Sequence, residues 1–365
     1  MSDSIPTENS VQHTKPVRVS VVVPCRNEIR HIRAFLDSML LQKLGPIEME
    51  VLIADGMSDD GTRQVLEEYQ TRYAGVTILD NPEQIVSTGL NRAIREAQGE
   101  IILRMDAHSV YATDYIRSCV DVLQETNADN VGGPTLTRAD GYLAQAIAHA
   151  YQSPFARGGK KHCDPRYEGP VETVAYGCWR RSTFDYVGMF DEDLVRSQDY
   201  ELNVRTRALG GTVWRTPRIV SWYWPRASLS GLFRQYFQYG FWKVAVIRKY
   251  SALVSWRNLV PGACLLLGIV LLVCAALARL GNSALLQEAI LAPCIAFAGA
   301  YLMASLAAAI SIARREGWKF LPALPFVFGV YHLSYAVGFV FGLMIRHAAR
   351  GNPSPIQKVL TAITR

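Results

Sequence analysis

Two stretches near the N-terminus, VRVSVVVPCRNE at residues 17–28 and VLIADGMSDDGT at residues 51–62, decide the fold. Each opens with an apolar run rich in β-branched residues, which is typical of a buried strand, and each ends in turn-forming and polar residues. Helical spacing of apolar residues follows each stretch, so strands alternate with helices and a mostly parallel α/β sheet is predicted. The predicted elements are strands over 17–24, 49–54, 76–79 and 101–105 and helices over 28–44, 62–73 and 87–97.

Charge is divided unevenly along the 365 residues. Residues 226–365 hold fourteen Lys and Arg against two acids, a net charge of +12, whereas residues 1–225 carry −6. Hydrophobic residues make up 50% of the chain, which excludes a disordered protein, and seven cysteines without a CxxC pair exclude a disulfide-stapled miniprotein. Basic residues that flank apolar runs indicate a membrane-bound region at an anionic cytoplasmic leaflet, and they argue against nucleic acid as a partner.

The C-terminal region is predicted to attach the protein to a membrane. Residues 232–256 are aromatic and basic, as in amphipathic helices at a membrane interface. Three apolar spans follow at 259–278, 285–313 and 320–345, each long enough to cross ~30 Å of hydrocarbon. The third span holds prolines and glycines, so it either crosses or re-enters; length favours three crossings, and the positive-inside tendency favours two. The predicted division is a flexible tail (1–16), an α/β domain (17–225), amphipathic interfacial helices (226–257), a transmembrane region (258–345) and a basic tail (346–365).

The two opening motifs resemble the start of family 2 glycosyltransferases of the GT-A (Rossmann-like) fold. There a P-x-x-N-E turn and a strand ending in D-D-G-S-x-D-G-T border the donor, and this chain departs from the second pattern at Gly56 and Met57. The resemblance implies that Asp55 binds the uracil or ribose of a UDP-sugar, although taken alone Asp55 would be a structural cap. Ligands also bind at the carboxyl ends of strands in such sheets. The implied nucleotide- and donor-binding residues are Pro24, Arg26, Glu28, Asp55, Asp106 and Gly177.

The segment GEIILRMDAH, residues 99–108, matches the position at which family members carry a metal-binding D-x-D. Here the pair is Asp106 and His108, and alternate residues on an extended stretch point the same way, so both reach one ion. A carboxylate with an imidazole suits Mn²⁺ better than Mg²⁺, and we expect one of these two cofactors. The alternative for His108 is a neutral hydrogen-bonding role. Asp-x-His resembles the succinoglycan-type (ExoA-like) membrane-bound branch of the family.

Two further segments resemble family motifs. SQDYELN matches the E-D segment whose Asp is the general base, which implies that Asp199 deprotonates the acceptor hydroxyl and that Gln198 replaces the preceding acid. The alternative for Asp199 is a capping role at a helix N-terminus. YGCWR matches the strand behind the donor sugar, where Gly177 would let the ligand approach and Trp179 would offer a stacking face.

The segment RQYFQYGFW, residues 234–242, resembles the Q-x-x-R-W segment of membrane-bound processive synthases. Gln238 replaces its Arg, which argues against processivity. The basic and aromatic composition suits a lipid diphosphate and the first acceptor sugar, and the alternative is membrane anchoring without substrate contact. The predicted acceptor or membrane-interface residues are Trp179, Gln198, Arg234, Gln235, Gln238 and Trp242.

These motifs predict an inverting, metal-dependent glycosyltransferase. It would move a hexose, expected to be glucose from UDP-glucose, to a polyprenyl-diphosphate-linked saccharide in polysaccharide biosynthesis. The first 16 residues lack the apolar core of a signal peptide, so we expect a multi-pass protein of the inner (cytoplasmic) membrane, in contact with membrane lipids, with its catalytic domain in the cytoplasm. The alternatives are a polyprenyl-phosphate glycosyltransferase similar to dolichol-phosphate-mannose synthases and a non-catalytic nucleotide-sugar-binding membrane subunit. A non-enzyme needs no base, so the Asp199 motif argues against the subunit.

Overall fold

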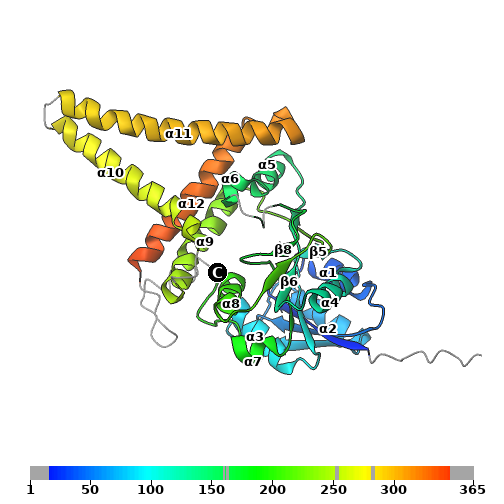
Figure 1. Cartoon of the computed structure of the whole chain (residues 1–365). Coiled ribbons are helices and arrows are strands. Elements are labelled where there is room, and N and C mark those ends of the chain that lie inside the picture. The colour runs from blue at the N-terminus through cyan, green and yellow to red at the C-terminus, as the bar shows by residue number, and fades with distance from the viewer. Residues whose placement is uncertain (1–15, 159–160, 162–163, 251–254, 281–283, 346–365) are drawn as a thin grey trace, which may run out of the picture.

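The computed structural model describes residues 16–158, 161, 164–250, 255–280 and 284–345 (Figure 1). Apart from Pro16, the predicted tails at 1–16 and 346–365 lie outside the described residues.

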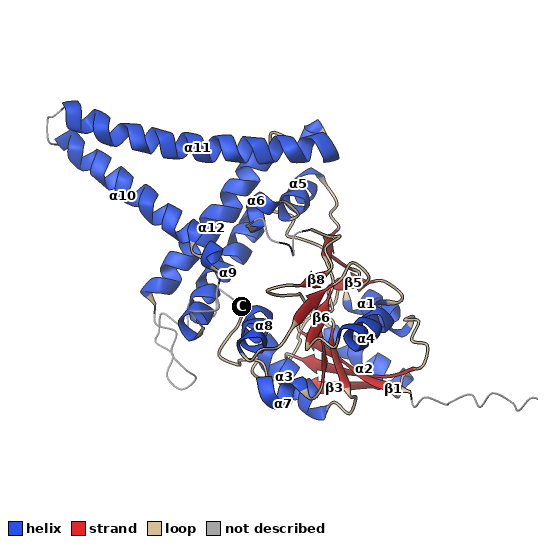
Figure 2. Ribbon diagram, viewed as in Figure 1, coloured by secondary structure: helices blue, strands red, loops and turns tan. Residues whose placement is uncertain are grey.

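An eight-stranded sheet forms the centre of the α/β domain (Figure 2). Its strand order is β3-β2-β1-β4-β9-β6-β10-β8, with β9 antiparallel to both of its neighbours. The parallel register aligns Cys25 with Asp55 and Asp55 with Asp80, so the carboxyl ends of the first three strands lie at one edge. The strands are β1 (Val17–Cys25), β2 (Ile47–Asp55), β3 (Val76–Asp80), β4 (Ile101–Arg104), β6 (Asn130–Gly132), β8 (Gly169–Pro170), β9 (Cys178–Arg180) and β10 (Val213–Arg215).

Helices cover both faces of this sheet because alternate residues of the buried strands point to opposite sides. Val19, Val21 and Val23 belong to the core under α1, α2 and α4, whereas Val22 packs with Leu90 of α3 in the core of the other face. The helices are α1 (Ile32–Leu40), α2 (Thr62–Arg72), α3 (Val86–Glu96), α4 (Tyr115–Thr126), α5 (Tyr142–Tyr151), α6 (Pro154–Arg157), α7 (Thr183–Val187) and α8 (Gln198–Ala208).

A smaller sheet stands beside the carboxyl end of β4. Its order is β5-β11-β7, from Ser109–Tyr111, Ser221–Tyr223 and Thr135–Thr137. β11 ends just before the helical C-terminal region, so this sheet connects the strand ends of the α/β domain to the long C-terminal helices.

The first predicted helix is shorter than its apolar spacing indicated. Residues 28–44 were expected to be helical, but α1 begins at Ile32. The preceding residues are held by the loop after β2: Asn27 has a φ of 55°, its N–H donates to Ser58 Oγ (2.9 Å), and the Glu28 N–H donates to Thr62 Oγ1 (2.8 Å). These bonds join the two opening motifs of the chain into one rigid edge.

Four long helices follow β11. They are α9 (Leu229–Lys249), α10 (Val260–Leu280), α11 (Ala284–Glu316) and α12 (Leu324–Met344). By length and composition, α10, residues 288–316 of α11, and α12 are three candidate membrane spans. α10 and α11 form an open hairpin that projects away from the sheet domain (Figure 1).

Glycines bring α9 and α12 into close contact. A Cβ added at Gly338 would lie 2.0 Å from the Phe237 carbonyl oxygen, and one at Gly240 would lie 2.1 Å from that of Tyr335. Of the two alternatives for the third apolar span, the structure has the continuous helix, and the glycines of α12 make room for α9. α9 is one helix that buries Phe241, Trp242 and Val244, so it packs more deeply than a purely interfacial amphipathic helix.

Candidate active site

A cavity of about 1570 Å³ opens at the carboxyl ends of the central strands. Its floor includes Pro24 near the end of β1, Gly56 after β2 and Asp106 after β4. From there it continues past α5, α6 and α9 to side chains of α10, α11 and α12. One cavity therefore joins the strand ends to the apolar helices.

Three charged side chains form the centre of the floor. Arg104, which is 4% exposed, donates from Nε and Nη2 to the two carboxylate oxygens of Asp106 (2.9 and 3.1 Å). Its third nitrogen, Nη1, donates to Asp199 Oδ1 at the start of α8. One guanidinium thus links the predicted metal ligand to the predicted base and fixes their relative positions.

The environment of Asp199 suits a proton acceptor. Burial raises the pKa of Asp199 to about 6; the charge of Arg104 opposes this shift and the charge of Asp106 adds to it. The side chain keeps 28% of its surface open to the cavity, so it remains reachable although protein surrounds it. Burial lowers the pKa of Arg104, but the charges of Asp106 and Asp199 outweigh it and the guanidinium stays protonated. Near neutral pH, Asp199 is therefore an ionised carboxylate with raised basicity.

His108 lies at the mouth of the same floor. Its Nδ1 is 3.2 Å from Glu28 Oε1, its side chain is 44% exposed, and its ring meets Tyr223 edge to face. Burial lowers the pKa of His108, and the Glu28 hydrogen bond and the Asp106 charge together reverse this and raise it above its ordinary value.

The donor set fits a divalent ion shared with a substrate. Each Asp106 oxygen accepts one hydrogen bond from Arg104 and keeps a lone pair, and both Asp106 and His108 line the cavity. No cluster of three or more possible metal ligands occurs among the residues that the structure describes. An ion held by Asp106 and His108 would thus take its remaining ligands from a diphosphate and water.

Asp55 is placed beside the cavity but not in its lining. It is 1% exposed; one oxygen accepts bonds from the N–H and hydroxyl of Ser58 (3.2 and 2.6 Å), and the other lies 3.3 Å from Arg63 Nη1. Its neighbours Ala54 and Gly56 do line the cavity. A Cβ at Gly56 would lie 3.1 Å from the Arg26 side chain, so glycine here makes room for Arg26.

Two predicted site residues, Trp179 of the acceptor group and Gly177 of the donor group, face the core. Trp179 is 1% exposed and packs against Phe184 and Phe190, so its ring offers no stacking face to a ligand. Gly177 has a φ of 106°, and an added Cβ would lie 2.4 Å from Trp179 and 2.7 Å from Asn130 Oδ1. Packing of Trp179, not approach of a ligand, therefore requires this glycine.

The other five predicted acceptor residues divide into two groups. Gln198 and Gln235 line the cavity, and Gln235 Nε2 donates to the hydroxyls of Tyr223 (3.0 Å) and Tyr239 (3.2 Å). The other three do not belong to the lining, because two are buried between α9 and its neighbours and one is exposed. They are Gln238 and Trp242, which are buried, and Arg234, which is exposed.

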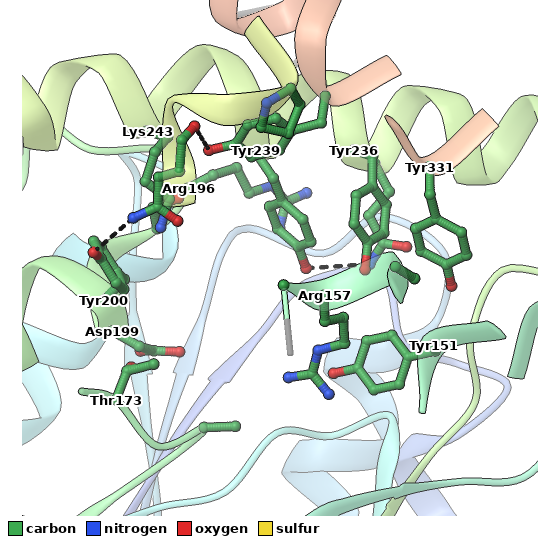
Figure 3. A pocket seen from close by; sticks show the side chains of 18 of the residues that line it. Tyr151, Arg157, Thr173, Arg196, Asp199, Tyr200, Tyr236, Tyr239, Lys243 and Tyr331 are labelled. Carbon is green, nitrogen blue, oxygen red and sulfur yellow. Dashed lines mark hydrogen bonds between the residues drawn. The ribbon is translucent and has the colours of Figure 1, made fainter. Parts of the chain in front are cut away.

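Several lining residues were not predicted from the sequence. Arg104 had one visible sign, a charged residue ending the apolar strand IILR, where every residue is buried. The other lining residues that were not predicted lie in segments without a family motif. Arg196, Tyr200 and Lys243 lie on one side of the cavity, and Tyr151, Arg157, Tyr236 and Tyr331 lie on the other (Figure 3).

The fold and site match proteins of one family. The model of glycosyl transferase family 2 matches residues 20–184. The succinoglycan biosynthesis protein ExoA of Rhizobium meliloti (strain 1021) is 35% identical over 243 residues, 66% of this chain and 73% of the relative. A Methanococcus voltae enzyme, dolichyl N-acetyl-α-D-glucosaminyl phosphate 3-β-D-2,3-diacetamido-2,3-dideoxy-β-D-glucuronosyltransferase, is 25% identical over 89% of this chain and 97% of its own. The solved mannosyltransferase PcManGT of Pyrobaculum calidifontis, in complex with GDP-Man and Mn²⁺, superposes with a TM-score of 0.57 at 20% identity over 86% of each chain.

The α/β sheet with its carboxylates beyond the strand ends is thus the GT-A domain of a glycosyltransferase. The chain belongs to glycosyl transferase family 2. The predicted fold class and family are confirmed, including the C-terminal helices that are long and apolar enough to span a membrane.

Proposed function

We propose that this protein is an inverting, metal-dependent glycosyltransferase that moves glucose from UDP-glucose to a saccharide linked to polyprenyl diphosphate. The observation that carries the proposal is the single cavity that contains Asp106, His108 and Asp199 at one end and reaches the apolar helices at the other. Such a cavity fits an acceptor whose sugar meets the strand ends while its lipid stays among the helices.

Asp199 supplies the base for inversion. The acceptor hydroxyl oxygen forms a bond to the sugar C1 as the bond from C1 to the diphosphate oxygen breaks on the opposite face, and Asp199 takes the hydroxyl proton. A pKa of about 6 leaves Asp199 ionised at neutral pH and still basic enough to accept that proton. Arg104 keeps the carboxylate aimed at the cavity through its hydrogen bond.

The strand ends bind the donor. Pro24 and Arg26 border the space next to Asp106, and Asp55 holds the loop after β2 that faces the nucleoside. Mn²⁺ or Mg²⁺ held by Asp106 and His108 would neutralise negative charge on the diphosphate leaving group. The Glu28 carboxylate orients the His108 ring.

The lipid-linked acceptor is supported by composition and by relatives. α10 has a mean hydropathy of 2.7 over its most apolar window, which suits a lipid environment. The Methanococcus voltae relative is named for action on a dolichyl-phosphate-linked sugar, and ExoA is named for succinoglycan biosynthesis. We place the enzyme in the inner (cytoplasmic) membrane with its GT-A domain in the cytoplasm, where nucleotide sugars are made.

The test is turnover by the purified full-length protein in detergent with Mn²⁺. UDP- and GDP-sugars are screened against a polyprenyl-diphosphate-linked sugar and against polyprenyl phosphate, with and without a chelator. The proposal expects UDP release and sugar transfer only with the diphosphate-linked sugar, abolished by the chelator. Transfer to polyprenyl phosphate itself would identify the alternative class, and tight UDP binding without turnover would identify a non-catalytic subunit.

A further inference from the structure

The cationic middle of the cavity carries an inference about how the acceptor is held. We infer that Arg196 and Lys243 bind the diphosphate of the lipid-linked acceptor and that its isoprenoid tail lies between α10, α11 and α12. The inference rests on the proposed function and assigns residues to its acceptor site.

The cavity lining is strongly basic. It contains eight Lys and Arg against three acids, and all three acids belong to the catalytic floor. Arg104 is paired with the carboxylates of the floor and Arg257 with Glu172 (3.0 Å), while Arg157 and Lys243 lie over the rings of Tyr151 and Tyr200 (4.2 and 3.2 Å). The excess positive charge fits a multiply charged anion in addition to the donor.

Arg196 stands between the base and the helices. It lies three residues before Asp199 in the segment that leads into α8, and it lines the cavity. Its Nε is buried and has no hydrogen-bond partner among the described residues. Figure 3 shows Arg196 on the same side of the cavity as Tyr200 and Lys243. A buried donor without a partner is costly, so an anionic ligand is its natural complement.

Lys243 approaches the same region from α9. Its Nζ lies 3.2 Å from the centroid of the Tyr200 ring, the residue next to Asp199. The Tyr200 hydroxyl accepts a hydrogen bond from Asn258 Nδ2 (3.1 Å), so the base, Lys243 and the turn before α10 meet at one place. A diphosphate at Arg196 and Lys243 would leave its attached sugar beside Asp199.

Beyond these cations the lining becomes apolar. Pro261, Leu265 and Leu272 present one face of α10 to the cavity, because residues four and seven apart share a face of a helix. Phe297 of α11 and Leu333 of α12 face the same space. The cavity thus passes from cationic residues to an apolar groove, in the same order as the diphosphate and the isoprenoid tail of the acceptor.

The head-group test uses the full-length protein with Arg196→Gln and Lys243→Gln, singly and together. Acceptors are a polyprenyl-diphosphate-linked sugar and the same sugar as a neutral octyl glycoside. We expect each substitution to raise the KM for the diphosphate acceptor about tenfold, as for loss of a charge-assisted hydrogen bond, with little change for the octyl glycoside or the donor. Lys43→Gln and Arg72→Gln, exposed positions outside the cavity lining, are the charge-matched controls.

The tail is tested separately with Gly268→Phe. Gly268 lines the groove, and an added Cβ would lie 3.8 Å from Phe297, so a phenyl ring would fill the space between the helices. We expect the KM to rise for a long isoprenoid acceptor and to stay unchanged for a ten-carbon one. Competition by inorganic diphosphate, which has no tail, should weaken in the Arg196→Gln and Lys243→Gln variants and not in Gly268→Phe.

The results separate the two proposals. If the wild-type protein uses no lipid-linked acceptor, the proposed function fails. If it does, and the double variant keeps its full preference for the diphosphate over the octyl glycoside, the assignment of Arg196 and Lys243 is wrong. An unchanged KM of Gly268→Phe for the long acceptor would overturn the placement of the tail.

A different observation concerns how the protein sits in the membrane. We propose that α12 lies along the bilayer surface with α9 and that only α10 and α11 cross. α12 has 21 residues, about 32 Å, so a crossing helix would carry one end to the far side. Both of its ends instead contact elements tied to the GT-A domain. The N-terminal end is joined where Tyr142 of α5 donates to the Lys319 carbonyl (2.7 Å) and Tyr331 donates to that of Ile147 (3.2 Å).

The C-terminal end of α12 is joined through α9. Arg248 donates to the carbonyls of Leu343 and Ile345 (2.8 Å each), and the adjacent Lys249 forms an ion pair with Asp191 of the GT-A domain. Ile345 also packs on the cluster that contains Leu194. The most apolar window of α12 is 44% buried, against 6% for α10 and 11% for α11. The tip of the α10–α11 hairpin points away from the GT-A domain, whereas the C-terminal part of α11 returns to pack beside α5 (Figure 1).

Single cysteines test this topology in vesicles of known orientation. In a background with the native cysteines replaced, Leu41→Cys marks the GT-A domain, Leu280→Cys the end of α10 and Met344→Cys the end of α12; these side chains are 72%, 81% and 77% exposed. An impermeant maleimide should label Met344→Cys from the same side as Leu41→Cys and Leu280→Cys from the other. A fluorescent protein fused after Arg365 should be digested by protease from the Leu41 side. Digestion from the Leu280 side would establish three crossings and overturn the proposal.

Discussion

The sheet end and the helical end of the cavity are built by different means. At the sheet end, strand register and one buried guanidinium hold Asp106 and Asp199 in a single arrangement. At the helical end, backbone contacts at Gly240 and Gly338 set the spacing of α9 and α12, and aromatic and cationic side chains line the wide space between them. The chemistry needs carboxylates fixed to within fractions of an ångström, whereas a bulky acceptor needs room.

The largest expected effect is a loss of activity at the sheet end of the cavity, without a change in its shape. Asp199→Asn keeps an oxygen that accepts from Arg104 but removes the proton acceptor. We expect kcat to fall ~10²- to 10⁴-fold, the usual contribution of a general base, with the KM for the donor little changed. Turnover with the diphosphate-linked acceptor measures the loss, and UDP binding serves as the control. A loss of less than tenfold would remove Asp199 as the base.

The next effect tests the guanidinium that joins the two carboxylates. Arg104→Met leaves Asp106 and Asp199 without their shared cation in a largely buried site, and breaking such a pair typically costs about 3–5 kcal/mol. We expect the lower end of that range, because water in the cavity screens Asp199. Thermal unfolding in detergent measures the change. Arg104→Lys keeps the charge but cannot reach both carboxylates, so its unfolding midpoint should lie between those of Arg104→Met and the wild type.

One added methyl group tests the close packing of α9 against α12 at the helical end of the cavity. Gly338→Ala would bring a Cβ to 2.0 Å from the Phe237 carbonyl oxygen, so α9 and α12 must separate, at a cost of about 1–3 kcal/mol. The matched control is Gly299→Ala on α11, where an added Cβ meets nothing within 4 Å and helix propensity favours alanine by ~1 kcal/mol. Thermal unfolding compares the two. Equal midpoints would mean that close helix contact does not hold this end together.

The sheet end was also the more predictable one from the sequence. The strands expected at 17–24 and 76–79 appear as Val17–Cys25 and Val76–Asp80, because runs of β-branched residues determine a buried strand locally. Asp106, His108 and Asp199 were likewise assigned to one site, and the structure brings them to one cavity. Motifs at strand ends work because the sheet itself brings those ends together.

The features that the sequence did not predict depend on contacts between segments that are far apart in the chain. Trp179 was expected to face a ligand, but Phe184 and Phe190 enclose it, and no local pattern shows which face of β9 they cover. The prolines and glycines of the third apolar span left a continuous helix and a re-entrant segment both open, because their contact with α9 cannot be seen in the sequence. Arg196 and Lys243 belong to no motif, since their roles arise only where α8 and α9 meet.

The smallest expected effect is a pH dependence of kcat, which arises from the sheet end of the cavity alone. Burial raises the pKa of Asp199 from 3.8 to about 6, so the carboxylate becomes protonated as the pH falls below 6 and can no longer accept a proton. We expect kcat to be nearly constant above pH 7 and to fall toward tenfold for each unit below pH 6. The Arg196→Gln variant should keep the same profile, because that residue acts on acceptor binding. A rate that stays constant down to pH 5 would show that the base has a pKa well below 6 and would contradict the raised pKa of Asp199.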